Sequence, residues 1–166
     1  MKRTTSPCRC VIISGGQTGV DRGALDAALE VGCECGGWCP SGRLAEDGPI
    51  PERYPLTEIQ EFEGNGYPAR TRRNVEHADG TLILCVSRPG GGTALTLTSC
   101  RELRKPVTII NAELISAREA GGHAAAFVAH MAIQRLNVAG PRASQWPDGY
   151  AYARDVVRRL CSGAAE

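Results

Sequence analysis

The sequence predicts an α/β fold in three layers, with about five parallel strands between helices on both faces. Short runs rich in strand-forming residues alternate five times with segments of helical periodicity. Two of these runs lead into a glycine-rich loop that is followed directly by a helix. The length of 166 residues is enough for one apolar core. We therefore expect a single domain over residues 1–166, with an ordered core of about 9–161 and disordered ends.

The elements are expected in strict alternation along the chain. We predict strands at 10–14, 34–39, 81–86, 106–111 and 136–140, and helices at 20–29, 67–78, 94–104, 122–134 and 148–161. Residues 40–66 are rich in proline, glycine and charge, and we expect an ordered loop there. Numbering the strands along the chain, we expect the spatial order 2-1-3-4-5, which would place the first and third strands at the point where the order reverses.

The two glycine-rich loops are the candidate ligand site. Gly15–Gly19 follows the first predicted strand and Pro89–Thr93 follows the third. Glycines let backbone N–H groups approach a phosphate closely, and the dipole of a following helix favours the anion. Thr93 is placed either to cap its helix or to bind the ligand. One such loop is equally consistent with a flexible turn, but two at the same edge of a sheet favour one phosphate-bearing ligand.

Polar residues outside the loops extend this candidate site. Arg43, Glu46 and Asp47 lie in the long loop, where each is either a ligand contact or a plain surface residue. Arg70 and Asn74 lie at i and i+4 of a predicted helix, so they can aim two donors at one target.

Composition argues against several partners and reactions. The net charge of +1 gives no reason to expect nucleic acid or an anionic membrane. No apolar run approaches the roughly 18 residues of a transmembrane helix, and no signal sequence is recognised, so we expect a cytoplasmic protein. A Walker loop, a G-x-G-x-x-G fingerprint and a Ser–His–Asp set are missing from the sequence.

The chain has eight cysteines, and we expect reduced, mostly buried thiols. The alternative is a zinc site at Cys33, Cys35 and Cys39, perhaps joined by Cys8 and Cys10. None of these spacings is the C-x-x-C of ordinary zinc sites, so no structural metal is expected.

Several blocks of the sequence, in order, resemble the family of molybdenum cofactor carrier proteins. These blocks are 15–22, 37–48, 70–75, 91–96 and 137–142. The resemblance implies a Rossmann-like fold related to the cytokinin-activating phosphoribohydrolases, long called lysine decarboxylases. It also implies a homotetramer or dimer, for which Ala124–Ala132 is the apolar stretch we would name. The implied cargo is molybdenum cofactor, a pterin with a phosphate tail, and molybdoenzymes are the implied recipients.

One departure from the phosphoribohydrolases favours binding over hydrolysis. Those enzymes have a catalytic glutamate shortly after Pro-Gly-Gly-x-Gly-Thr, where this chain has Thr96. A threonine hydroxyl is not a general base at neutral pH. Hydrolysis is still an alternative if Asp21, Glu46 or Asp47 has taken over the role of the glutamate. A second alternative is a sensor that binds a nucleotide or an ADP-ribose-like ligand.

The complete candidate set combines both loops, the helix residues and the resembling blocks. Its members are Gly15, Gly16, Gln17, Thr18, Gly19, Asp21, Arg22, Arg43, Asp47, Arg70, Thr71, Asn74, Gly90, Gly91, Gly92, Thr93 and Thr96. No residue is assigned as catalytic, and we favour a binding protein over an enzyme.

Overall fold

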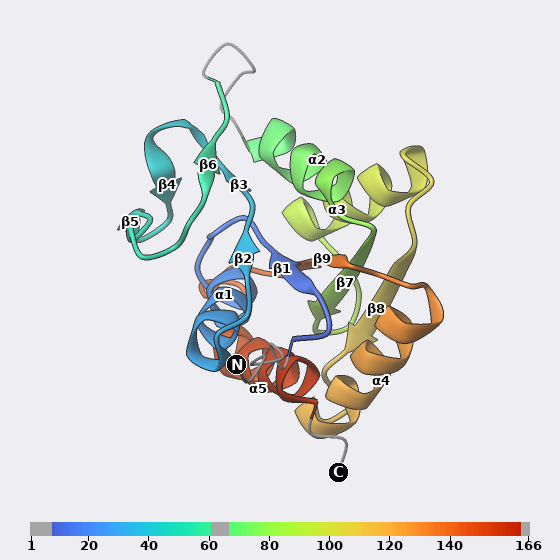
Figure 1. The fold of residues 1–166 in the computed structure, drawn as a ribbon. Helices are drawn as coiled ribbons and strands as arrows, with labels where there is room; N and C mark the ends of the chain where they lie inside the picture. The colour runs from blue at the N-terminus through green and yellow to red at the C-terminus, as the bar shows by residue number, and fades with distance from the viewer. Residues whose placement is uncertain (1–7, 61–66, 164–166) are drawn as a thin grey trace, which may run out of the picture.

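A parallel sheet of five strands forms the centre of the computed structural model, which describes residues 8–60 and 67–163 (Figure 1). Its strands are β1 (Val11–Ile13), β2 (Cys35–Gly36), β7 (Gly80–Cys85), β8 (Val107–Asn111) and β9 (Arg135–Ala139). Every neighbouring pair is parallel. The predicted parallel sheet is confirmed.

Helices cover both faces of this sheet (Figure 1). The helices α1 (Val20–Val31), α4 (Ala117–His130) and α5 (Gly149–Ser162) lie on one face, and α2 (Tyr67–His77) and α3 (Gly91–Glu102) lie on the other. The three-layer α/β class is therefore confirmed. Helix α4 begins at Ala117 instead of residue 122, because Ser116 and Glu119 form a capping box that starts it earlier.

The two faces of the sheet differ in polarity. Leu82 and Leu136 belong to the apolar cluster that the sheet forms with α1, α4 and α5. On the side of α2 and α3, Asn137 Nδ2 donates to Thr81 Oγ1 at 3.3 Å, and Thr96 of α3 is also buried. Buried polar groups require partners. This side of the sheet therefore offers a polar interior.

The order of the strands differs from the prediction. The sheet runs β2-β1-β9-β7-β8, so the last strand of the chain lies in its centre and the expected order 2-1-3-4-5 is wrong. Burial gives the reason: Leu136 and Val138 of β9 are completely buried, whereas Ile109 of β8 is 42% exposed at the edge. Counting β9 as the first strand gives 3-2-1-4-5, the common order of dinucleotide-binding folds. The order then reverses between β9 and β7.

The predicted second strand is divided in two by Gly37. Its φ of 139° suits glycine, and a Cβ there would collide with the Ser14 carbonyl oxygen. After Gly37 the chain forms what we call the arm, residues 38–60, in place of the loop expected there. The arm contains β3 (Trp38–Cys39), η1 (Ser41–Arg43), β4 (Leu44–Ala45), β5 (Gly48–Pro49) and β6 (Thr57–Glu58). It is ordered, as expected; the rest of the predicted loop, 61–66, lies outside the described residues.

Cys8 and Cys33 form a disulfide, with Cα atoms 5.4 Å apart. The expectation of reduced thiols is wrong for this pair, because the fold brings together two residues that are 25 positions apart in sequence. Of the six free cysteines, only Cys35 is partly exposed, and burial raises the pKa of Cys10 to about 11. The ends 1–7 and 164–166, where we predicted disorder, lie outside the described residues. Within the described ranges, no helix is long and apolar enough to cross a bilayer.

Candidate functional site

A cavity of about 290 Å³ opens where the strand order reverses, between β9 and β7. The loop after β9 leads to α5 and the loop after β7 leads to α3, on opposite faces of the sheet, so the two loops diverge and leave a crevice. The cavity is lined by Gln17, Asp21, Tyr67, Arg70, Thr71, Gly91, Gly92, Thr93, Thr96, Ala139, Gly140, Pro141, Arg142 and Gln145. Both glycine-rich loops therefore reach one cavity, although β9 separates their strands.

The first turn of α3 presents backbone donors to this cavity. Gly90 is the N-cap and makes no side-chain cap, and Gly91 and Gly92 are exposed. Thr93 is not the cap; its amide donates to the Gly90 carbonyl oxygen at 3.0 Å. The amides of Gly91 and Gly92 have no backbone acceptor among the described residues. Together with the helix dipole, they make this end of α3 suitable for an anion.

A buried ion pair forms another part of the wall. Arg70 Nη1 lies 3.4 Å from Asp21 Oδ2, and the two side chains are 14% and 6% exposed. Burial raises the pKa of Asp21, and the charge of Arg70 offsets part of that rise. Arg70 Nε is buried and has no hydrogen-bond partner within the described part of the chain. Such a donor costs about 1–3 kcal/mol, and an acceptor atom on a ligand would remove that cost.

A small polar chamber of about 20 Å³ adjoins the main cavity and shares Asp21, Arg70, Thr71, Thr96 and Ala139 with it. The remaining lining residues of the chamber are Gly15, Asn74, Asn137 and Val138. A space of this size holds roughly one water molecule or one polar atom of a ligand.

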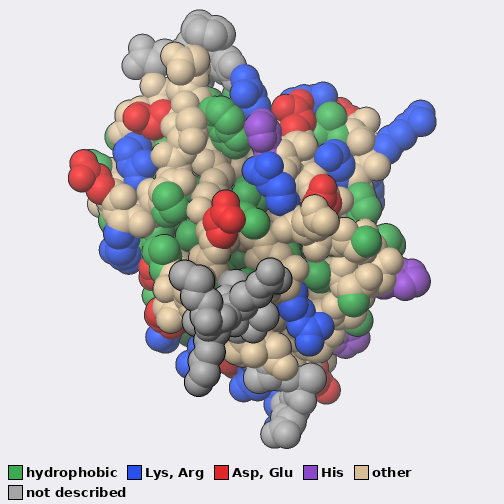
Figure 2. Space-filling view, viewed as in Figure 1, with side chains coloured by type: hydrophobic (Ala, Val, Ile, Leu, Met, Phe, Trp, Pro, Cys, Tyr) green, Lys and Arg blue, Asp and Glu red, His purple; other side chains and the backbone are tan. Residues whose placement is uncertain are grey.

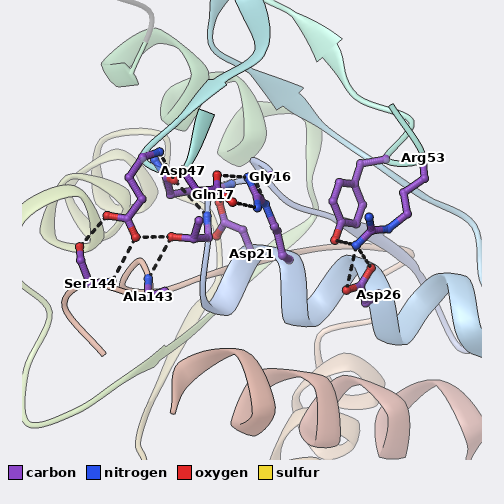
Figure 3. Close-up of polar contacts among 12 residues, drawn as sticks. Gly16, Gln17, Asp21, Asp26, Asp47, Arg53, Ala143 and Ser144 are labelled. Atoms are coloured by element: carbon purple, nitrogen blue, oxygen red, sulfur yellow. Dashed lines mark hydrogen bonds and ion pairs between the residues drawn. The ribbon is translucent and has the colours of Figure 1, made fainter. Parts of the chain in front are cut away.

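Two carboxylates of the arm contact α1 and the loop after β1 (Figure 3). Arg22 donates to Asp47 from Nη1 at 2.6 Å and from Nη2 at 2.8 Å, and its Nε donates to the Gly16 carbonyl oxygen at 3.0 Å. The bonds from Arg22 lower the pKa of Asp47. The other carboxylate is that of Glu46, which binds Thr18. Among the described residues around the cavity, neither carboxylate forms part of its wall.

Arg43 and Asn74 support the fold. Arg43 donates to four backbone carbonyl oxygens between Ile50 and Leu56, at 2.8–3.3 Å. Asn74 Oδ1 accepts from the Trp38 amide at 2.7 Å, and Asn74 Nδ2 donates to the Trp38 carbonyl oxygen at 3.0 Å. Because the polar atoms of both side chains are engaged within the protein, we assign both a structural role; Arg43 lies outside both cavities, whereas Asn74 lines the small chamber.

Four other candidates, Gly16, Thr18, Gly19 and Gly90, shape the loops without lining the cavity. Gly19 has a φ of 82°, and a Cβ there would lie 2.6 Å from the Pro141 carbonyl oxygen. Glycine at this position therefore allows the loop after β1 to approach the loop after β9 closely.

Sequence reasoning missed the loop after β9, because β9 was expected at the edge of the sheet. This loop supplies Gly140, Pro141, Arg142 and Gln145 to the cavity. The signal that could have found most of them is the block 137–142, which we used only for the family resemblance. Tyr67, at the start of α2, was missed as well.

A larger cavity of about 380 Å³ lies elsewhere, beside β1, β2 and His77 at the end of α2. It contains none of the glycine-loop residues. On the face shown in Figure 2, acidic and basic side chains are interspersed, without a patch of one sign. We take the smaller cavity as the candidate site because it combines a helix N-terminus, a buried arginine and both loops.

Comparison with known proteins identifies the family. A model described as the circularly permutated YpsA SLOG family matches residues 12–161. The crystal structure of a putative molybdenum carrier protein from Syntrophus aciditrophicus SB is 40% identical, with a TM-score of 0.87, over 92% of this chain and 96% of that one. None of the curated proteins matches the chain. A circular permutation also explains why the last strand takes the place of the first in the order 3-2-1-4-5. The predicted resemblance is confirmed, and the chain belongs to the circularly permutated YpsA SLOG family.

Proposed function

We propose that this protein is a carrier that binds molybdenum cofactor non-covalently. The phosphate of the cofactor accepts hydrogen bonds from the amides of Gly91 and Gly92, at the N-terminus of α3. Arg70 binds a second acceptor atom of the cargo, and Arg142 and Gln145 border the remaining space. The cofactor keeps its own metal ligands. The relative of 40% identity, named a putative molybdenum carrier protein, supports this choice of cargo.

The observation that carries the proposal is the pairing of two donor sets in one cavity. One set is the first turn of α3, where Gly91 and Gly92 are exposed and no side chain caps the helix. The other is Arg70, whose buried Nε has no partner within the described residues. A phosphate-bearing ligand that spans the cavity supplies acceptors to both.

The acidic residues support binding over hydrolysis. Of the three candidate bases, only Asp21 lines the cavity, and its Oδ2 already accepts from the Gln17 amide at 3.2 Å besides pairing with Arg70. Thr96 is buried and donates its hydroxyl to the Gly92 carbonyl oxygen at 3.1 Å. The position of the phosphoribohydrolase glutamate therefore holds a hydroxyl that is hydrogen-bonded within α3.

A second candidate function is binding of a nucleotide, by a sensor or by a phosphoribohydrolase-like enzyme. The strand order favours it, because folds ordered 3-2-1-4-5 bind nucleotides at the point where the order reverses. The same donors would hold nucleotide phosphates. The two candidates therefore differ in the ring system that the rest of the cavity binds, which is the pterin of the cofactor or the base of a nucleotide.

The proposal also covers the oligomeric state of the protein, its cellular location and the enzymes that receive its cargo. We propose a cytoplasmic homotetramer or dimer that passes its cargo to molybdoenzymes. The last turns of α4 offer apolar surface for such an assembly, and Met131, which follows them, is 47% exposed. Light scattering at micromolar concentration tests this part, and a monomer would contradict it.

Calorimetry and thermal unfolding with molybdenum cofactor, AMP, NAD and ADP-ribose test the function, together with an assay for released base. A ligand present at 100 times its dissociation constant stabilises the fold by about 2.7 kcal/mol. We expect this shift with molybdenum cofactor and no released base. Base released from AMP, and lost in Asp21→Ala, would instead establish the enzyme.

Gly92 provides a matched pair of variants. A Cβ built on Gly92 meets nothing within 4 Å, so Gly92→Ala should keep binding. Gly92→Asp should fold equally well, because an acidic side chain in the first turn of a helix is favourable. Its charge should nevertheless repel the phosphate, and we expect at least roughly tenfold weaker binding, which corresponds to ~1.4 kcal/mol.

A further inference from the structure

Glu46, at the tip of the β4–β5 hairpin, joins segments that are far apart in the sequence. Its Oε1 accepts from Thr18 Oγ1 at 2.5 Å and from the Ser144 amide at 3.1 Å, and its Oε2 accepts from Ser144 Oγ at 2.6 Å. Arg142 Nε lies 3.5 Å from Oε2. The Glu46 amide also donates to Gln17 Oε1 at 3.1 Å.

These contacts hold two walls of the cavity together. Gln17, from the loop after β1, lines the cavity, and so do Arg142 and Gln145, from the loop after β9. The Thr18 hydroxyl strengthens the connection, because it donates to Glu46 and accepts from the Ala143 amide at 3.0 Å. A hydroxyl has one donor and two lone pairs, so it can make both bonds at once. One carboxylate thus links both loops from outside the cavity.

We infer that Glu46 is a positioning residue, whose hydrogen bonds fix loops 15–19 and 141–145 in the arrangement that the ligand requires. The inference rests on the proposed carrier function. Glu46 does not touch the ligand, since it lies outside the cavity wall formed by the described residues, and the role of general base considered from the sequence is not supported. Hydrogen bonds from Ser144 and Thr18 lower the pKa of Glu46, which keeps it ionised at neutral pH.

The neighbouring Asp47 is a matched control. It carries the same charge in the same hairpin turn, and its side chain is 50% exposed. It pairs with Arg22, on α1, and no hydrogen bond or ion pair joins it to loop 141–145 within the described residues. A general effect of negative charge on the hairpin would therefore appear at both positions, whereas positioning of the two loops would appear at Glu46 alone.

The experiment compares Glu46→Ala, Glu46→Gln and Asp47→Asn in the full chain. Glutamine retains the positioning bonds, since its Oε1 still accepts from Thr18 and from the Ser144 amide, and its Nε2 donates to Ser144 Oγ. Two quantities are measured: the dissociation constant for molybdenum cofactor by calorimetry, and amide hydrogen exchange of the peptide 141–146 without ligand. Thermal unfolding reports global stability separately.

We expect Glu46→Ala to weaken cofactor binding by about tenfold and to speed exchange at 141–146, because the loops lose their common acceptor. In Glu46→Gln both the dissociation constant and the exchange rate should lie within about twofold of the wild type. The same is expected of Asp47→Asn. The inference would be overturned if Glu46→Gln lost as much binding and protection from exchange as Glu46→Ala, since the charge would then be responsible. Unchanged exchange at 141–146 in Glu46→Ala would overturn it as well. If the wild type binds no cofactor, the carrier function fails, while the exchange measurement still decides whether Glu46 orders the loops.

Discussion

The sequence predicts the same ligand-binding role for Asn74 and Arg70, but the structure gives them different roles. The substitution Asn74→Ala tests that difference. The substitution removes two hydrogen bonds to the Trp38 backbone, of 2.7 and 3.0 Å, from a side chain that is 3% exposed. Each bond contributes about 1–1.5 kcal/mol, so the loss is about 2–3 kcal/mol. For a protein of this size, ~1 kcal/mol shifts the unfolding temperature by roughly 2–4 °C. The expected fall is therefore about 4–12 °C.

Calorimetric unfolding and cofactor binding, both measured on the same variants, make the comparison. Arg72→Ala is the control on the same helix, since its ion pairs with Glu76 and Glu102 are exposed and contribute less than ~1 kcal/mol. Asn74→Ala should keep cofactor affinity within about threefold at a temperature where it is folded. The reasoning is refuted if Asn74→Ala unfolds at the same temperature as Arg72→Ala but no longer binds the cofactor.

Three further predictions concern the rest of the molecule. Arg43→Ala should make the arm at least about tenfold more susceptible to limited proteolysis, because four backbone acceptors lose their donor; cleavage as slow as in the wild type contradicts this. A reductant should lower the unfolding temperature of the wild type but not of Cys33→Ser, since the bond to Cys8 stabilises the fold by roughly 3 kcal/mol; equal shifts would count against the disulfide. The lowered pKa of Asp47 means that its pair with Arg22 stabilises the fold above its ordinary pKa of 3.8 and is lost as the pH falls through the lowered value. Acid unfolding of Asp47→Asn should thus depend less steeply on pH, and an unchanged slope speaks against this pair.

The sequence predicted the strands of the central sheet, the helices and both glycine-rich loops, because these depend on local patterns of apolar residues and glycine. It did not predict the central position of β9. A central and an edge strand both read as short apolar runs, and only burial distinguishes Leu136 from the exposed Ile109. That one error hid the loop with Arg142 and Gln145, which forms a wall of the cavity.

Long-range partners account for the other differences. Arg43 and Arg70 look alike in the sequence, yet one donates to four carbonyl oxygens of the arm and the other keeps a buried donor without a partner in the described residues. Likewise, nothing in the local sequence singles out Cys8 and Cys33 among eight cysteines. Such pairings follow from the tertiary fold, which spacing along the chain does not reveal.

The central claim is that the cavity between β9 and β7 holds a phosphate-bearing cargo at the N-terminus of α3. The most direct measurement is a crystal structure of the protein grown with molybdenum cofactor. The account predicts the phosphate within hydrogen-bonding distance, ~3 Å, of the Gly91 and Gly92 amides, with an acceptor atom of the cofactor at Arg70 Nε. Cofactor bound in the larger cavity beside His77, with the first turn of α3 unoccupied, would contradict it.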